Sequence, residues 1–195
     1  MLSEINACLK EIGHCGLPED EGPCCVVDPY EVAVKLIEEA QVGDPAWAAV
    51  NMVRYCDAPR EWAEGVIERA QVGDPANAAV EMAWRYGSAR KWAEGVIERA
   101  QTGDPAYAAF EIALCCGSSR RWAKKVIKNA KIGDPARAAA DMVRYLGASR
   151  KWAEGVIEHA QTGDPARAAD QMVRCHGSSR EWADRVAARM QSQRS

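Results

Sequence analysis

The sequence predicts an all-α protein, an α-solenoid built from 30-residue helix-turn-helix repeats. The tetrapeptide Gly-Asp-Pro-Ala begins at residues 43, 73, 103, 133 and 163, so it returns every thirty residues without slippage. Between these turns, apolar residues recur with the spacing of amphipathic helices. A fixed period of this size is typical of stacked repeat arrays. We therefore divide the 195 residues into five regular repeats over 43–195 and a divergent N-terminal capping hairpin over 1–42.

The N-terminal segment is predicted to contain two helices joined by an acidic, cysteine-containing loop. Ser3 is expected to cap a first helix that runs to about His14, and residues 16–28 are rich in proline, glycine and acid, as loops are. A second helix is expected over 30–41. Residues 1–42 contain nine acidic residues and two lysines, a charge of −7, whereas the chain as a whole has a net charge of −3.

Each regular repeat is predicted to form two short antiparallel helices, which we call helix A and helix B. In the first repeat Asp44 is the expected N-cap of helix A and Pro45 its first residue, where a missing N–H costs nothing. Helix A should run to about Cys56, and helix B should cover residues 60–71. In the other repeats glycines close helix A, and serines or their neighbours should cap helix B: Gly87, Gly117, Gly147 and Gly177, and Ser88, Ser118 and Ser178.

Certain residues are the same in all five repeats and are expected to form the core. In the first repeat these are Ala46, Ala48, Ala49, Arg60, Trp62, Ala63 and Val66. Small residues on helix A let helices approach closely, and the tryptophan of helix B is expected to fill the space between layers. Over about residues 28–192 the chain resembles the α-solenoid superfamily of two-helix repeats, the HEAT- and TPR-like arrays, although its Gly-Asp-Pro-Ala turn is not the TPR signature. That resemblance implies a binding scaffold.

The fifth, eighth and twelfth positions of each repeat vary between copies and fall on one stripe of helix A. The stripe changes from apolar to basic along the chain. Its expected apolar anchors are Trp47, Trp84, Tyr107, Phe110 and Leu114, and its expected acid-binding residues are Arg137, Arg144, Arg167 and Arg174. Aromatic residues beside arginines are typical of interface hot spots. We therefore expect a partner that is a protein or peptide, acidic or amphipathic. The alternative is that these side chains pack between neighbouring helices or under the N-terminal segment.

A second row consists of one arginine at the start of every helix B: Arg60, Arg90, Arg120, Arg150 and Arg180. A cation there opposes the helix dipole, so each guanidinium is predicted to cap carbonyls at the end of a neighbouring helix A. The alternative is a ladder of anion sites. In repeat three, Lys124, Lys128 and Lys131 stand in a basic stripe, which is either a solvated face or a docking patch for an acidic partner, for RNA or for the N-terminal acids. Anion or nucleic-acid binding through these two features is the alternative function.

The N-terminal segment contains four cysteines, a residue type that can bind metal ions. Cys8, Cys15, Cys24 and Cys25 are candidate metal ligands, but they include no Cys-x-x-Cys pair, and free thiols in a cap core are the alternative interpretation. The sequence contains no phosphate loop and no nucleophile motif, so we expect neither an enzyme nor a cofactor. It also contains no run of about 18 apolar residues and no signal peptide at its start, so we expect a cytoplasmic protein without a membrane span.

Overall fold

The computed structural model describes residues 28–192, and this range contains eleven helices and no strand. The helices are α2 (Pro29–Glu38), α3 (Pro45–Cys56), α4 (Arg60–Arg69), α5 (Pro75–Arg85), α6 (Arg90–Arg99), α7 (Pro105–Cys115), α8 (Arg120–Asn129), α9 (Pro135–Leu146), α10 (Arg150–His159), α11 (Pro165–His176) and α12 (Arg180–Ser192). The predicted α-solenoid is confirmed. The first predicted helix lies outside the described residues.

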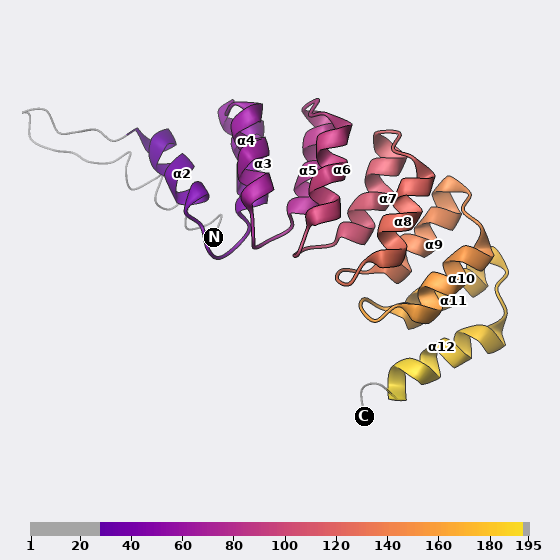
Figure 1. The fold of residues 1–195 in the computed structure, drawn as a ribbon. Coiled ribbons are helices and arrows are strands. Elements are labelled where there is room, and N and C mark those ends of the chain that lie inside the picture. The colour runs from indigo at the N-terminus through magenta and orange to yellow at the C-terminus, as the bar shows by residue number, and fades with distance from the viewer. Residues whose placement is uncertain (1–27, 193–195) are drawn as a thin grey trace, which may run out of the picture.

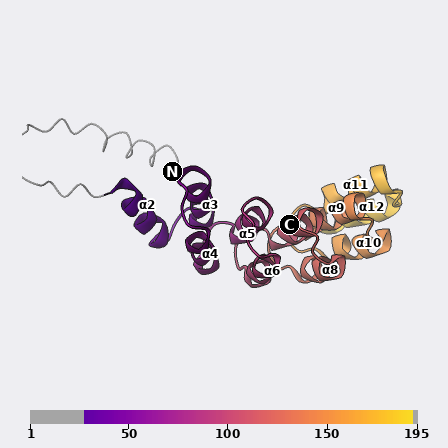
Figure 2. The same cartoon turned by 90° about the horizontal axis from the view of Figure 1, so that it is seen from above.

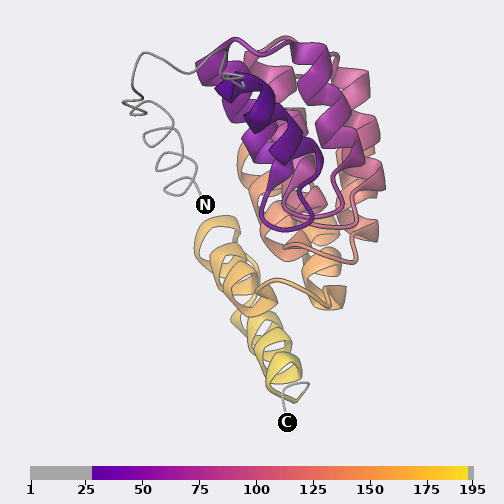
Figure 3. The ribbon, with the colours of Figure 1, turned by 90° about the vertical axis from the view of Figure 1, so that its left-hand side faces the viewer.

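The helices form two layers, shown from above in Figure 2. Helix A of the five repeats is α3, α5, α7, α9 and α11, and helix B is α4, α6, α8, α10 and α12. Each helix A packs against the next helix A, whereas successive B helices make no comparable contact. The row of hairpins is bent into an arc, whose inner edge carries the turns between hairpins (Figure 1). Seen from its N-terminal end, the row runs from α2 at the top of the view to α12 at the bottom (Figure 3).

The core is made mainly by alanine, methionine and isoleucine. At one position of helix A the alanine has no exposed surface in any of the five repeats: Ala49, Ala79, Ala109, Ala139 and Ala169. The largest fully buried side chains of helix B are its isoleucines: Ile67, Ile97, Ile127 and Ile157. The tryptophans of helix B were expected to fill the space between layers, but only Trp182 is buried. The other four helix B tryptophans, Trp62, Trp92, Trp122 and Trp152, are half-buried and pack against the edge of the core.

The Gly-Asp-Pro-Ala turns of the first four repeats each cap their own helix A and bond to the next turn. The predicted N-cap is confirmed, because one carboxylate oxygen of Asp104 accepts the backbone N–H of Tyr107 at 2.9 Å. The other oxygen accepts the backbone N–H of Asp134, the equivalent residue of the next repeat, at 3.0 Å. Gly133 has a φ of +76°, and a Cβ there would lie 2.2 Å from Asp104 Oδ1. The turn therefore needs glycine both for its backbone conformation and for the close approach of the carboxylate.

Ser88, Ser118 and Ser178 do not themselves cap helix B, and of their neighbours only Ser179 does so. The backbone N–H groups of Ser88, Ser118 and Ser178 donate to the carbonyls of Met82, Ile112 and Met172, so these serines close helix A. The reason is the preceding glycine, whose positive φ turns the chain back onto the last helical carbonyls. Helix B is capped by a serine side chain only in repeats four and five, where Ser149 and Ser179 accept the N–H groups of Trp152 and Trp182.

Candidate functional site

The central position of the predicted helix A stripe is buried. Phe110 is only 3% exposed, and its ring lies between those of Tyr107 and Tyr145, at centroid distances of 5.5 and 6.0 Å. Val50, Val80 and Ala140 occupy the same repeat position and are buried as well. The eighth position faces the neighbouring helix A because these helices pack so closely. Phe110 is therefore a core residue and is not available as a surface anchor.

Exposed apolar side chains are instead found in the last turns of helix A. Trp84 and Leu114, both predicted anchors, are 53% and 45% exposed. Tyr55 and Tyr145 are 70% and 53% exposed, and they stand one position further along the repeat, in the last turn of the same helix A. We call these four residues of α3, α5, α7 and α9 the apolar row. These two tyrosines stand at the thirteenth position, outside the fifth, eighth and twelfth positions that make up the predicted stripe. An aromatic residue in a polar last turn was the available signal.

An arginine lies over each aromatic ring of the apolar row. The guanidinium carbons of Arg54, Arg85 and Arg144 lie 5.1, 4.7 and 5.0 Å from the ring centres of the adjacent Tyr55, Trp84 and Tyr145. Cation–π contacts of this kind hold the ring and the charge side by side. The surface therefore presents apolar and cationic groups together on three of its four helices.

Two of the other predicted anchors contribute mainly to packing between repeats. Trp47 and Tyr107 are half-buried against the core. Arg137 lies over the Tyr107 ring at 4.2 Å and donates a hydrogen bond to its hydroxyl at 3.2 Å. These contacts join α7 to α9. At the fifth position of the repeat, these side chains therefore pack between neighbouring helices, which is the alternative interpretation of the stripe.

Acidic side chains lie beside the apolar row and neutralise part of the predicted basic end. Arg85 pairs with Glu81 at 2.8 Å and Arg174 with Asp170 at 2.8 Å. Burial raises the pKa of Glu111, and the nearby Arg137 guanidinium opposes that shift. The remaining predicted acid-binding residues, Arg144 and Arg167, are exposed and make no ion pair with any described residue. The surface is therefore mixed in charge, and only part of its arginines are paired with acids among the described residues.

The row of arginines at the start of helix B mostly does what the capping prediction says. Nη1 of Arg60, Arg90 and Arg150 donates to the carbonyl oxygens of Gly87, Gly117 and Gly177 at 3.3, 3.1 and 2.8 Å. Each of these glycines closes the helix A of the next repeat.

Two members of this arginine row depart from the pattern. Arg180 pairs with Asp170 of α11 at 3.0 Å, within its own hairpin. Arg120 makes no hydrogen bond and no ion pair with the described residues. It lies on α8 with Lys124, Lys128 and the nearby Lys131, in the layer opposite the apolar row (Figure 2).

The candidate metal ligands Cys8, Cys15, Cys24 and Cys25 lie outside the described residues. Within residues 28–192, no group of three or more His, Cys, Asp or Glu side chains is arranged to hold a metal ion. The cysteines of this range are free: Cys56, Cys115, Cys116 and Cys175. Burial raises the pKa of the Cys115 and Cys116 thiols, which keeps them protonated and less reactive.

Comparison of the chain with family models, with curated proteins and with solved structures found no match. In the part of the chain that the structure describes, no helix is both long and apolar enough to cross a bilayer.

Proposed function

We propose that this protein is a helical-repeat scaffold that binds a protein or peptide through the apolar row. The observation that carries the proposal is the exposure of Tyr55, Trp84, Leu114 and Tyr145 on four successive helices, with an arginine over each aromatic ring. Exposed aromatic residues beside arginine have the composition of interface hot spots. A folded chain gains nothing from leaving such side chains in water at regular intervals.

The dimensions of the apolar row suit a short peptide. Packed helices lie about 10 Å apart, so four of them span roughly 30 Å. An extended peptide of about nine residues covers that distance at about 3.3 Å per residue. Apolar side chains of the peptide would meet Trp84 and Leu114.

The charges favour an acidic or amphipathic partner. Acidic residues of the peptide would meet the exposed Arg54 and Arg144, which have no ion pair with any described residue. The acids beside the row are already engaged, since Glu81 pairs with Arg85 and Asp141 accepts a hydrogen bond from Gln171. We propose binding and not catalysis, and a cytoplasmic setting, which the free thiols of the described cysteines suit.

The test is capture of partners by the native chain and by a variant with Trp84→Ser, Leu114→Ser and Tyr145→Ser. All three side chains are largely exposed, so the variant should keep its fold. The matched control is Leu36→Ser with Val42→Ser, which removes two exposed apolar side chains outside the apolar row. Any partner that is captured is then purified and titrated against all three proteins.

The proposal expects the partner to bind the native chain and the control alike and to bind the triple variant at least tenfold more weakly. That difference should persist at high salt, because apolar contacts are not screened. Equal binding by the native chain and the triple variant would remove the apolar row from the function.

A further inference from the structure

Helix α8 departs from the pattern that the other B helices follow. Where α8 has Lys124, Lys125 and Lys128, repeats one, two and four have Glu, Gly and Glu: Glu64, Gly65 and Glu68, then Glu94, Gly95 and Glu98, then Glu154, Gly155 and Glu158. All three differences make α8 more positively charged than these three B helices, and all three fall within about one helical turn on one face of α8.

The carboxylates that α8 lacks have a structural role elsewhere. The first glutamate of each set pairs with the arginine four residues before it, as Glu94 does with Arg90 at 3.6 Å. Of the second glutamates, Glu98 accepts the indole N–H of Trp122 in the next repeat at 2.7 Å, as Glu38 of α2 accepts that of Trp62 at 2.9 Å. The indole N–H groups of Trp92 and Trp182 make no such bond.

In α8 these contacts are missing. Arg120 has no partner among the described residues, and Lys128 cannot accept the N–H of Trp152. Lys124 instead lies 5.0 Å from the Trp152 ring centre. The lysines therefore replace contacts that stabilise the array, and local departures from a scaffold's own rule are expected at functional positions.

The cations of this segment lie on one side of the helix. Residues 120–131 include six basic side chains and no acid: Arg120, Arg121, Lys124, Lys125, Lys128 and Lys131. At 3.6 residues per turn the five on α8 occupy an arc of about 140°, over a length of roughly 12 Å, and Lys131 follows two residues after the helix ends. All except Lys124 are exposed.

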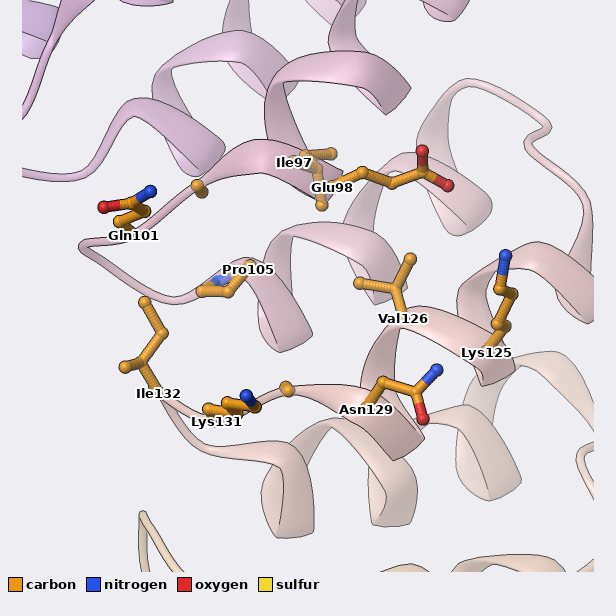
Figure 4. A pocket seen from close by; sticks show the side chains of 11 residues that line it. Ile97, Glu98, Gln101, Pro105, Lys125, Val126, Asn129, Lys131 and Ile132 are labelled. Atoms are coloured by element: carbon orange, nitrogen blue, oxygen red, sulfur yellow. The ribbon is translucent and has the colours of Figure 1, made fainter.

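A pocket opens beside these cations, between the ends of α6 and α8 (Figure 4). Its volume is about 510 Å³, and its apolar lining includes Ile97, Val126 and Ile132. The charged residues of the same lining are Lys125, Lys131 and Glu98, and the Glu98 carboxylate already accepts the Trp122 N–H. A pocket of about 420 Å³ occupies the equivalent place between α2 and α4, but its charged residues are Glu38, Glu39 and Arg69. The spacing of neighbouring helices thus produces the pocket in both places. Of the two pockets, only the one beside α8 has lysines in its lining.

We propose that the basic face of α8 and this pocket together form a docking site for an acidic peptide segment that carries an apolar residue among its carboxylates. The apolar side chain enters the pocket, and the carboxylates pair with Lys125, Lys128 and Lys131. Because α8 lies in the layer opposite the apolar row, the site is separate from the one proposed above. A protein with both sites would bridge two partners.

The aromatic residues of this region favour a peptide over RNA. Single-stranded nucleic acids bind largely by stacking bases on exposed aromatic rings. Trp122 is half-buried with its N–H bonded to Glu98, and Lys124 covers a face of Trp152. The α8 site therefore offers charge and an apolar hollow but no free ring.

The test is fluorescence anisotropy with a labelled peptide of glutamates around one central leucine. The variant is Lys124→Glu, Lys125→Gly and Lys128→Glu, which gives α8 the residues of repeats one, two and four and so keeps the fold, as circular dichroism can check. We expect the native chain to bind the peptide and the variant to bind it about 100-fold more weakly. An all-glutamate peptide should bind the native chain about tenfold more weakly than the leucine peptide.

Two controls separate this site from its alternatives. The variant with Trp84→Ser, Leu114→Ser and Tyr145→Ser should bind the leucine peptide as tightly as the native chain does, because it leaves α8 intact. Labelled oligouridylate of equal charge should bind more weakly than the peptide. The proposal is overturned if the α8 variant keeps its affinity, if the leucine makes no difference, or if the oligouridylate binds more tightly than the peptide.

Discussion

Asp104 accepts a hydrogen bond from the backbone N–H of Asp134 at 3.0 Å, thirty residues further along the chain. The same contact joins each Gly-Asp-Pro-Ala turn to the next, at 3.0 to 3.4 Å: Asp44 to Asp74, Asp74 to Asp104, and Asp134 to Asp164. Each carboxylate also caps its own helix A. One side chain thus fixes a helix start and the stacking of two repeats, which explains why the period does not slip.

Asp104→Ala should lower the free energy of unfolding by about 2–3 kcal/mol, because it removes a helix cap and leaves a partly buried N–H without its acceptor. Asp164→Ala is the matched control. Its carboxylate caps α11 but receives no N–H from a following repeat among the described residues, so its loss should be about 1 kcal/mol. Urea unfolding followed by circular dichroism measures both, and equal losses would argue against a stacking role.

Gly133→Ala should destabilise the protein by about 2 kcal/mol or more, because the residue has a positive φ and its new Cβ would meet the Asp104 carboxylate. Gly155→Ala should do the opposite. It lies inside α10, with nothing within 4 Å of the added Cβ, so better helix propensity should raise stability by about 0.5–1 kcal/mol. Melting temperatures that fall in both variants would contradict this account of the turn.

Phe110→Ala should lower the free energy of unfolding by about 3–5 kcal/mol, as expected for a large buried side chain. Leu114→Ser, one helical turn away but exposed, should change it by no more than about 0.5 kcal/mol. Denaturant unfolding of the two variants distinguishes core from surface along helix A. Phe110 belongs to the surface only if its truncation is as mild as that of Leu114.

The stability of the protein should depend on the ionisation of Glu111. Burial raises the pKa of Glu111 in the folded state above the ordinary 4.5, and the neighbouring Glu81 adds to that shift. The folded state therefore holds this proton more strongly than the unfolded state, so the contribution of Glu111 to stability is full below pH 4.5 and is lost as pH rises through its raised pKa.

Glu111→Gln places at this position the residue that repeat five has as Gln171. The variant should be more stable than the native chain near neutral pH and should lose this advantage in acid. Glu61→Gln is the opposite case, because a backbone hydrogen bond and Arg60 lower the pKa of Glu61. Unfolding in urea at several pH values checks both directions, and a native profile that rises with pH across this window would contradict the role given to Glu111.

The sequence was sufficient for the architecture because the repeat encodes it locally. The Asp-Pro start and the glycine end of helix A can be recognised from capping chemistry alone, as at Asp104 and Gly117. The same chemistry did not distinguish Ser178 from Ser179, because the serine that follows a helix-closing glycine returns its N–H to the preceding helix while the next serine caps α12. Which of two adjacent serines caps the next helix depends on backbone conformation.

The surface was harder to predict because exposure depends on how neighbouring repeats approach. Helix spacing alone places Phe110 and Leu114 on one stripe, yet the first is buried by α9 and the second is exposed. Tyr145 is the opposite case: it was not predicted as a surface anchor, and the packed structure shows that its ring is exposed. Likewise, Arg120 lacks the carbonyl contact that Arg90 and Arg150 make among the described residues, and this difference is visible only in the packed structure. Interactions across repeats are outside the information that a single repeat contains.

The most direct test of the proposed function is site-specific photocrosslinking from the apolar row. A photoreactive phenylalanine analogue replaces Leu114, and in a second protein it replaces Glu61, which is exposed on helix B. Both are irradiated in cell extract, and crosslinked peptides are identified by mass spectrometry. The account predicts that the Leu114 protein crosslinks a defined acidic or amphipathic segment that the Glu61 protein does not, and that excess native chain competes it away. The same weak adducts from both positions, unaffected by competition, would contradict it.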